Sequence, residues 1–414
     1  MNGTVHIIGA GLAGLSAAVH LADQAKDVIV HEGTSHGGGR CRSYFDDHLG
    51  CRIDNGNHLL LSGNGATLEY LERIGAKHSL VGPDQARFPF IDLKTGESWQ
   101  VIPDKGIVPW SLFSRAGRVP GTSLGEYVRG ISLAFASPNK TVSECLAGPG
   151  PLYERFWEPL AVSVLNTEAD QASARLLWPV IQETFGRGAA ACVPLIVREG
   201  LSESFVDPAI KYLEDKKCQI SFDDRLKSLV FTDNKITALV FSTNTVKLDK
   251  EDIVILAVPP TVAGALVPDL TVPDDFRPIV NGHFRIPDTH SEVRFIGLTG
   301  GHSHWLFIRN NIASITISAA TQIVPRSNEW IAETLWSEIC VALNLGDRAL
   351  GDHRIVKEKR ATFAQTPAQL KRRPKARTSY QNLFLAGDWT DNGLPATIEG
   401  TIRTGKLAAE LARV

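Results

Sequence analysis

Several features that mark particular protein classes are missing from this chain of 414 residues. Its six cysteines form no C-x-x-C pair, and their spacing fits neither a zinc site nor a disulfide framework. We therefore expect buried or inert thiols in a reducing cytosol and no metal site. Basic residues are not in excess either, because the formal net charge is -2. A chain without a basic surface is not expected to bind nucleic acid.

Signals for crossing or entering a membrane are also missing. The longest uncharged apolar stretch, Ile253 to Pro268, is interrupted by Pro259 and Pro260. It is shorter than the roughly 20 residues that a spanning helix needs. No basic leader precedes the first predicted strand, so we expect no signal peptide. These absences predict a cytoplasmic protein, either soluble or peripheral on the inner face of the cytoplasmic membrane.

The sequence does contain a glycine fingerprint between a predicted strand and a predicted helix. Gly9 to Gly14 reads G-x-G-x-x-G directly after the apolar residues Val5 to Ile8. In this pattern Gly9 permits a tight turn, Gly11 lets a pyrophosphate approach the backbone, and Gly14 lets helix and strand pack closely. The helix start, which includes Ala13, offers N–H groups and a positive dipole end to phosphates. The alternative is a strand, turn and helix with chance glycines.

Glu32 strengthens the fingerprint because it ends the next predicted strand, Val28 to Val30. It lies near the spacing of about 20 residues at which a carboxylate bonds the ribose hydroxyls of a bound dinucleotide. The same carboxylate would repel a 2′-phosphate, which argues against NADP.

Two further segments favour FAD over NAD. Gly38 and Gly39 allow close approach to a cofactor, and Arg40 offers a fork of donors to phosphate. Far along the chain, Gly387 and Asp388 follow a buried strand. A helix then begins in the segment Ala396, Thr397 and Ile398, where N–H groups can face the pyrimidine edge of a flavin. Simpler alternatives are a flexible surface turn at Gly38 to Arg40 and a turn cap at Asp388.

The chain is predicted to form an α/β protein with a Rossmann-like nucleotide domain and an inserted α+β substrate domain. Residues 1–80, 200–270 and 356–414 are assigned to the FAD-binding domain, and residues 81–199 and 271–355 to the substrate domain. Strands are expected at Leu226 to Phe231, Ile236 to Phe241 and Ile253 to Val258. Helical spacing is found between Leu152 and Leu165, and alternation between Ile312 and Ile317.

Together these motifs resemble the flavin-containing amine oxidase and phytoene desaturase superfamily. Two segments, Asp54 to Leu61 and Gly387 to Gly400, are similar to the hydroxysqualene dehydroxylase family, as is Glu358 to Ala364 more briefly. Two positions depart from the family pattern: Asn57 stands where Gln is expected, and Asn392 stands where Thr is expected.

The resemblance implies FAD as cofactor, a long apolar isoprenoid as substrate, and a separate, unidentified electron donor. It also implies a set of cofactor contacts. They comprise Gly9, Gly11, Ala13 and Gly14 at the pyrophosphate, Glu32 at the ribose, Gly38, Gly39 and Arg40 between phosphate and flavin, Asn55 and Gly56 beside the flavin, Leu226 at the adenine, Gly387 and Asp388 at the ribityl chain, and Ala396, Thr397 and Ile398 at the pyrimidine edge.

The reaction that the family implies is reduction of hydroxysqualene to squalene by hydride from reduced flavin. Hydroxide leaves poorly, so an acid is expected; His58 is the first candidate and Asp391 the second. Structural roles remain open for both residues: a hydrogen-bonded histidine and a turn cap. Competing functions are a carotenoid-type desaturase, an amine oxidase and a non-catalytic prenyl-binding protein that holds no flavin.

The sequence leaves the roles of two segments open. The stretch 85–200 carries Trp99, Trp110, Trp157 and Trp178, which either line an apolar tunnel or form ordinary core. Lys371 to Arg377 carries five basic residues, which either touch anionic lipid or form a solvated loop.

Overall fold

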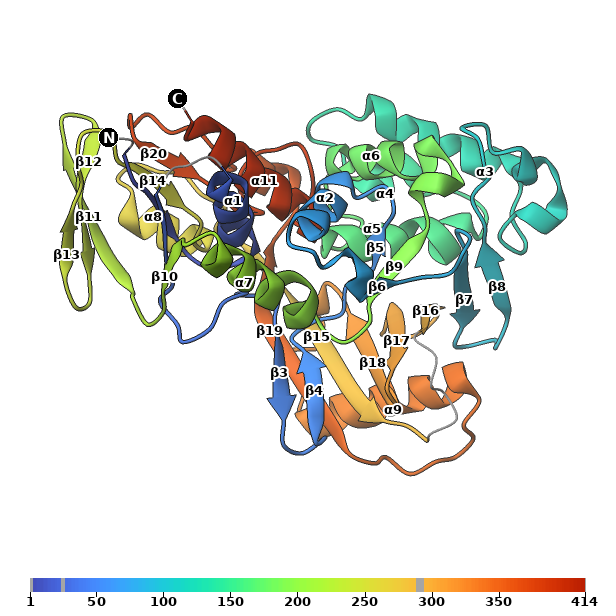
Figure 1. The fold of residues 1–414 in the computed structure, drawn as a ribbon. Coiled ribbons are helices and arrows are strands. Elements are labelled where there is room, and N and C mark those ends of the chain that lie inside the picture. The colour runs from blue at the N-terminus through green and yellow to red at the C-terminus, as the bar shows by residue number, and fades with distance from the viewer. Residues whose placement is uncertain (1–2, 24–26, 288–293, 414) are drawn as a thin grey trace.

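A computed structural model describes residues 3–23, 27–287 and 294–413 of the chain (Figure 1). A parallel sheet with its helices holds both ends of the chain. A second, larger sheet lies beside it under a layer of helices. The two parts alternate along the sequence, as the colours of the ribbon show, so each is assembled from separated segments.

The parallel sheet joins five strands that are far apart in sequence. From edge to edge they are β10 (Gln219–Ser221), β2 (Val28–His31), β1 (Val5–Ile8), β14 (Ile253–Leu256) and β20 (Leu383–Leu385). Every residue of β1, β14 and β20 is buried, as expected for parallel strands covered on both faces. The predicted Rossmann-like arrangement is confirmed, and β14 ends before Pro259 as expected.

The first and last long helices of the chain pack directly on each other. α1 (Leu12–Ala22) follows β1, and α11 (Ile398–Leu411) crosses it at Gly405. A Cβ atom at Gly405 would lie 2.3 Å from the carbonyl oxygen of Ala13 and 2.7 Å from the Cβ of Ser16. The Ser16 hydroxyl donates to the carbonyl of Ile402 at 2.9 Å. The C-terminal helix is thus part of the same core as the glycine fingerprint.

A small antiparallel sheet extends the nucleotide part at the far left of Figure 1. It contains β11 (Leu226–Thr232), β12 (Lys235–Phe241) and β13 (Thr245–Lys247). Asp233 and Asn234 turn between the first two strands with positive φ, as the predicted hairpin requires. Besides α1 and α11, the nucleotide part contains the helices α2 (Gly65–Arg73), α7 (Asp207–Asp215) and α8 (Pro260–Leu266).

The second part is built around a seven-stranded sheet. From edge to edge its strands are β19 (His353–Phe363), β15 (Phe276–Arg285), β18 (Ile312–Ile317), β17 (Trp305–Arg309), β16 (Arg294–Thr299), β7 (Phe88–Asp92) and β8 (Ser98–Val101). The predicted strand at Ile312 to Ile317 is confirmed as β18. The division into domains stays a prediction. Its boundary at residue 356 falls within β19, a strand of the seven-stranded sheet.

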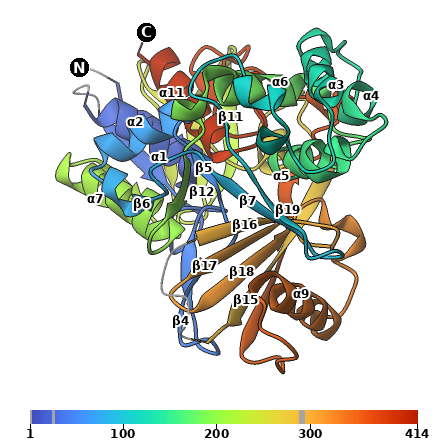
Figure 2. The ribbon, with the colours of Figure 1, turned by 90° about the vertical axis from the view of Figure 1, so that its right-hand side faces the viewer.

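Helices cover both faces of the seven-stranded sheet (Figure 2). α9 (Asn328–Leu343) packs on one face. The other face meets a helical layer that contains α3 (Leu124–Val128), α4 (Val142–Leu146), α5 (Glu158–Leu165) and α6 (Ala174–Glu183). The expected helix between Leu152 and Leu165 is present, with a π-helical turn at Tyr153–Trp157 before α5.

Three short pieces of structure connect the two parts. β3 (Ser43–Asp46) and β4 (Cys51–Asp54) form a hairpin, while β5 (Leu60–Leu61) and β6 (Leu80–Val81) both pair with β9 (Pro194–Val197). A four-residue helix, α10 (Pro367–Leu370), precedes the basic segment 371–377. No helix within the described ranges has the length and apolar character needed to cross a bilayer.

We expect Gly405→Ala to lower the melting temperature, because the added methyl group would strike the backbone of α1. Overpacking of this kind costs about 1–3 kcal/mol. Gly65→Ala is the matched control, since Gly65 also lies in a helix but a Cβ there meets no atom within 4 Å. Thermal unfolding of both variants checks this, and equal melting temperatures would contradict the close contact.

Candidate active site

The glycine fingerprint has the geometry that its sequence predicts. Gly9 has φ +105°, and a Cβ there would lie 2.6 Å from the carbonyl oxygen of Ala257. At Gly14 a Cβ would lie 1.9 Å from the carbonyl oxygen of Gly9. At Gly11, in contrast, a Cβ would meet no atom within 4 Å. Two glycines therefore allow the chain to pack, and the third leaves its backbone open to a bound group, as phosphate approach requires.

Glu32 connects the end of β2 to this loop. Its carboxylate accepts hydrogen bonds from the backbone N–H of Ala10 at 2.8 Å and from Thr34 N–H and hydroxyl at 2.9 Å each. The loop that leads to Leu226 lies beside it, because the N–H of Asp224 donates to the Glu32 carbonyl at 2.8 Å. Residues predicted for ribose and adenine are thus neighbours at one edge of the sheet.

The second glycine segment runs alongside the fingerprint. The N–H of Gly38 donates to the carbonyl of Ala10 at 2.8 Å, and Gly38 and Gly39 both have positive φ. A Cβ on Gly39 would lie 3.5 Å from the Cα of Gly11. The alternative of a flexible surface turn therefore does not describe this segment, which is bonded to the loop.

Arg40 joins the two ends of the chain. Its guanidinium donates to the carboxylate of Asp388 at 2.7 Å and to the carbonyl of Ala361. Asp388 is buried, while 45% of the Arg40 side chain is uncovered. Burial is the largest single influence on the pKa of Arg40 and lowers it. The Asp388 and Glu358 carboxylates together outweigh burial, so the pKa is raised. A permanently charged arginine with an uncovered face, held by a buried aspartate, suits a phosphate or flavin ligand.

The C-terminal segment brings a second helix start to the same place. The N–H of Gly387 donates to the Thr404 hydroxyl at 2.9 Å, and Thr397 caps α11 by accepting from Gly400 N–H at 3.2 Å. Trp389 is buried and donates to the carbonyl of Val258 at 2.9 Å, so it packs within the core. Ala396 and Ile398 flank the cap, and their contact with a flavin edge stays a prediction.

His58 lies among polar side chains from a third element. Asn57 donates to the Thr316 hydroxyl of β18 at 3.0 Å, and the amide of Asn281 on β15 donates to the Asn55 carbonyl at 3.2 Å. Gly56 lies between them, because a Cβ there would be 3.6 Å from the Asn281 amide nitrogen and 4.0 Å from His58 Nε2. Asn57, where the family pattern has Gln, is therefore a hydrogen-bonding residue that fixes this loop to the sheet.

The protonation of His58 is controlled by its surroundings. Burial lowers its pKa most, Arg40 lowers it further, and Asp54 raises it in part. The side chain nevertheless leaves a large part of its own surface uncovered. His58 is thus surrounded by protein but accessible from one side, with the neutral imidazole favoured at neutral pH.

Asp391, the second predicted acid, has a different environment. It is exposed, its N–H donates to the carbonyl of Pro374, and its carboxylate accepts from Gly393 N–H at 3.4 Å. This contact fits the turn-capping alternative, and the structure does not bring Asp391 into contact with His58 or Arg40.

On the face that contacts Asn57, the side chains of the seven-stranded sheet change from polar to aromatic. The register pairs Asn281 with Thr316, Thr316 with Trp305, Trp305 with Gly297, and Gly297 with Phe90. Directly paired residues share a face of the sheet. This row therefore runs from amide and hydroxyl groups beside His58 to aromatic rings at the far edge. A second row has the same order, with His283, Ser314, Phe307 and Phe295.

Most of these aromatic side chains pack against the helical layer. Trp305 donates to the Ser163 hydroxyl of α5 at 2.7 Å, and Phe90 stacks on Trp99 with ring centroids 5.7 Å apart. Trp99 and Trp157 belong to the same buried cluster, whereas Trp110 is 70% exposed. The tryptophans of residues 85–200 therefore differ in role, and at least Trp99 and Trp157 form ordinary core.

Three buried side chains support the site although sequence reasoning missed them. Glu399 accepts from the N–H groups of Ala66 and Thr67 at the start of α2, at 3.1 and 2.8 Å. Gln365 accepts from Ala396 N–H at 2.9 Å and donates to a carbonyl of the helical layer. For Glu399 the capping pattern at the start of α11 was a usable signal. Gln365 gave none, because its partners are remote in sequence.

Arg373 is the third of these side chains and changes the interpretation of the basic segment 371–377. It is buried and donates to the carbonyls of Leu394 at 2.9 Å, Asp388 at 3.2 Å and Thr390 at 2.5 Å. Arg372 also pairs with Asp274 at 2.8 Å. Arg373 is therefore not available to lipid, while Arg372 is ion-paired at the surface, and the lipid-facing interpretation of the rest of the segment stays a prediction.

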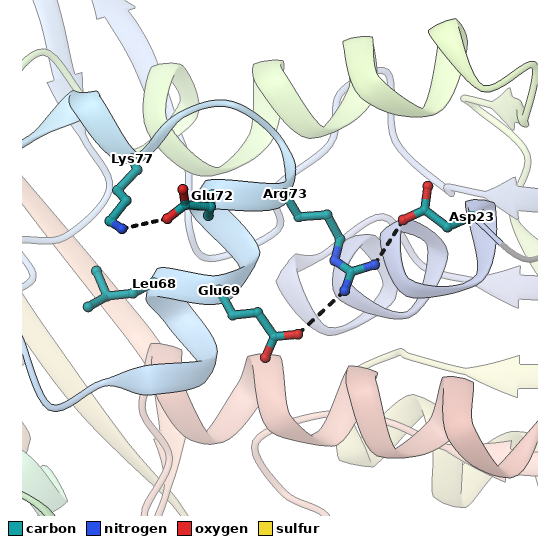
Figure 3. A pocket seen from close by; sticks show the side chains of 6 residues that line it. All are labelled: Asp23, Leu68, Glu69, Glu72, Arg73 and Lys77. Carbon is teal, nitrogen blue, oxygen red and sulfur yellow. Dashed lines mark hydrogen bonds and ion pairs between the residues drawn. The ribbon is translucent and has the colours of Figure 1, made fainter.

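A separate charged hollow lies on the outer side of α2 (Figure 3). Its lining consists of Asp23, Leu68, Glu69, Glu72, Arg73 and Lys77. Arg73 pairs with Asp23 at 2.8 Å and Glu69 at 3.4 Å, and Lys77 pairs with Glu72 at 2.5 Å. All five charged side chains of the lining are thus engaged in ion pairs, with three carboxylates against two cations. Across residues 3–23, 27–287 and 294–413, no group of three or more His, Cys, Asp or Glu side chains is arranged to hold a metal ion.

The thiols lie mostly or partly under protein. Cys41 and Cys192 are buried, and the other four are partly covered. Burial raises the pKa of Cys192 to about 12, so this thiol stays neutral and unreactive at physiological pH. The expected buried or inert thiols are thus confirmed for these two residues.

We expect Arg373→Gln to destabilise the loop of residues 388–394 and to lower the amount of FAD that copurifies. Removing the guanidinium leaves several buried carbonyls without a donor, at a cost on the order of 3 kcal/mol. Lys375→Gln, two residues away and exposed, is the control. Thermal unfolding and the flavin absorbance per chain measure both effects. An Arg373→Gln protein with normal flavin content would show that the loop does not need this arginine.

Similarities to known proteins agree with this geometry. The model of the flavin-containing amine oxidoreductase family matches residues 12–412. Among solved structures, an oxidoreductase from Methanosarcina mazei has a TM-score of 0.73 at 12% identity and covers 98% of this chain and 99% of its own. A putrescine oxidase has a TM-score of 0.71 at 14% identity and covers 99% of this chain and 98% of its own. These structures show the same fold.

Curated relatives are much more similar in sequence. A hydroxysqualene dehydroxylase from Rhodopseudomonas palustris is 44% identical over 412 residues, which cover 99% of this chain and 98% of that protein. Another from Zymomonas mobilis is 40% identical and covers 98% of both chains. A zeta-carotene desaturase from Synechocystis is 21% identical and covers 98% of this chain and 96% of its own. With a nucleotide fold, a paired set of helix starts and this full-length similarity, the chain belongs to the hydroxysqualene dehydroxylase family of the flavin-containing amine oxidoreductases and is an FAD-dependent oxidoreductase.

Proposed function

We propose that this enzyme reduces hydroxysqualene to squalene, replacing an allylic hydroxyl group by hydrogen. The observation that carries the proposal is the identity of 40–44% over essentially the full length to three proteins named hydroxysqualene dehydroxylase. The sheet face that changes from polar to aromatic supports it, since an isoprenoid alcohol has one polar reactive end and a long apolar chain.

The cofactor contacts are proposed residue by residue. The open backbone at Gly11, with Gly9, Ala13 and Gly14, holds the pyrophosphate, and Glu32 with Leu226 holds the adenosine. Gly38, Gly39 and Arg40 lie against the phosphates and flavin. Gly387 and Asp388 hold the ribityl chain, and Asn55, Gly56, Ala396, Thr397 and Ile398 surround the ring. The start of α11 directs its positive dipole end at the pyrimidine edge, where reduced flavin carries negative charge.

The reaction needs one hydride and one proton for each hydroxyl that leaves as water. Reduced FAD supplies the hydride when bound. We assign the proton to His58, whose imidazole is uncovered on one side and lies beside the polar end of the sheet row. Asn57 and Thr316 hold the loop that carries it. Asp391 is the second candidate, but its contact with Gly393 leaves it less well placed.

Aromatic side chains next to the polar end can assist departure of the hydroxyl group. Loss of hydroxide leaves positive charge spread over an allylic unit, and the faces of aromatic rings stabilise such charge. Trp305 is the aromatic residue that directly pairs with Thr316 across the sheet.

The electron donor and the location of the enzyme complete the proposal. We propose that a separate donor reduces FAD before each turnover and that the protein works at the inner face of the cytoplasmic membrane, where an apolar substrate collects. A carotenoid-type desaturase or an amine oxidase would use the same fold with the hydride moving from substrate to oxidised FAD.

The proposal is tested under anaerobic conditions with chemically reduced holoenzyme. Addition of hydroxysqualene is expected to reoxidise the flavin and to yield squalene in matching amount. Oxidised enzyme given squalene is the control for the reverse direction. Flavin that stays reduced in the presence of hydroxysqualene would refute the proposal, and saturated isoprenoids and amines would then be tried with oxidised enzyme.

If His58 is the acid, turnover should increase as the pH is lowered from 8 to 6. Burial and Arg40 hold the pKa of His58 below its usual value, so only a minority of molecules carry the cation at pH 7, and that share rises on acidification. His58→Gln should lower kcat by about 10²- to 10⁴-fold and abolish this dependence.

Flavin absorbance at each pH controls for loss of the cofactor. Asp391→Asn is the matched substitution for the second candidate, and it is expected to keep both rate and pH profile. A His58→Gln enzyme with the wild-type profile would assign the proton to another group.

A further inference from the structure

Large apolar side chains are exposed in one region of this protein far more than elsewhere. Of fourteen large hydrophobic residues that are exposed in the described part of the chain, eight lie between residues 102 and 135. They are Ile102, Ile107, Val108, Trp110, Phe113, Val128, Ile131 and Phe135. Eight such side chains within 34 positions suggest a contact surface, whereas single exposed apolar residues are ordinary.

Three of these residues lie on one helical segment. α3 continues into the 3-10 helix η4 (Arg129–Phe135), and Val128, Ile131 and Phe135 are 57, 58 and 83% exposed. The opposite side is fully engaged: Leu133 is buried, and a Cβ on Gly130 would lie 2.9 Å from the Trp157 ring. The segment is therefore anchored on one side and presents an apolar side outward.

A second group lies in a loop whose shape is fixed. Trp110 and Phe113 are 70 and 63% exposed, with their ring centroids 5.8 Å apart. Arg118 holds the loop by donating to the carbonyls of Leu112 at 2.5 Å and Phe113 at 3.3 Å. The N–H of Val119 donates to the Tyr127 hydroxyl at 2.8 Å, which ties the loop to α3. These rings are thus held at the surface by a bonded framework.

Basic residues outnumber acidic ones in this region. The basic residues between 102 and 140 are Lys105, Arg115, Arg118, Arg129 and Lys140. The acidic residues of this stretch are Asp104 and Glu126. Asp104 accepts from the Ser111 N–H and hydroxyl, and buried Glu126 accepts from Ser123 and from Leu152 N–H. With five basic and two acidic residues, the stretch carries a formal net charge of +3 around the apolar groups.

We propose that residues 102–135 form a docking surface for an anionic lipid bilayer. Aromatic and aliphatic side chains bordered by lysine and arginine are the combination that enters the interface of a membrane with anionic headgroups. α3 lies at the outer end of the helical layer, away from the nucleotide part, so this surface can meet a bilayer without covering the flavin site (Figure 1). The proposed function places the enzyme at the membrane, and this inference names the surface that makes the contact. It does not depend on the identity of the substrate.

The test is sedimentation of the full-length holoprotein with vesicles of phosphatidylglycerol and phosphatidylcholine, compared with phosphatidylcholine alone. Wild-type protein is expected to bind the anionic vesicles. The triple variant Trp110→Ser, Phe113→Ser and Phe135→Ser should lose at least ten-fold in affinity. The double variant Lys371→Gln and Lys375→Gln, at the exposed lysines of the basic segment 371–377, should bind as wild type does.

Flavin content and melting temperature confirm that each variant is folded. Unchanged vesicle binding by the triple variant would overturn the proposal, as would wild-type protein that ignores vesicles but self-associates with rising concentration through this surface. Turnover of detergent-dispersed hydroxysqualene separates the two proposals. The triple variant should retain it, so loss of docking with normal turnover leaves the proposed function intact, and docking without turnover leaves the docking surface intact.

Discussion

The ion pair between Arg40 and Asp388 is the contact on which the site depends. It joins residues separated by 348 positions and holds the second glycine segment against the last strand and helix of the nucleotide part. Asp388 is buried, so an unpaired carboxylate there would carry a large desolvation cost. Arg373 reinforces the same loop by donating to the backbone carbonyls of Leu394 and Thr390. Removal of either arginine would free the segment that orients the start of α11.

Around this pair, the protein brings two kinds of surface close together. The nucleotide side presents backbone N–H groups, helix starts and a permanent cation, all suited to phosphates. The seven-stranded sheet presents amides and hydroxyls that give way to aromatic carbon. His58 stands where the two meet. The reactive end of a substrate can therefore be polar while the remainder needs only shape and apolar contact.

Local patterns in the sequence predicted the nucleotide part well. The fingerprint and the strands around Asp233 depend on turn chemistry and on the apolar character of neighbouring residues, and Glu32 lies at the expected spacing of about 20 residues. The row from Asn281 to Phe90 could not be predicted, because it depends on strand order and register across five strands. Arg373 was misjudged for a related reason. Its five-in-seven basic segment resembles a solvated loop, and only tertiary structure shows that one member is buried.

The surface at residues 102–135 shows another limit of sequence reasoning. Apolar side chains three or four residues apart usually indicate a buried helix face, and three of them here are exposed, since a different side of the segment packs on Trp157. Spacing in the sequence does not show which side chains point outward.

The close crossing of α1 and α11 also has a consequence for biosynthesis. The glycine loop is complete within the first forty residues, but its partner helix spans Ile398–Leu411 at the other end of the chain. At roughly 5–20 residues per second, the ribosome needs about 20–80 seconds to deliver that helix. β1 can pair early with β2, but its other neighbour, β14, spans Ile253–Leu256 and α11 comes later still. The nucleotide part can therefore close its core only late in synthesis.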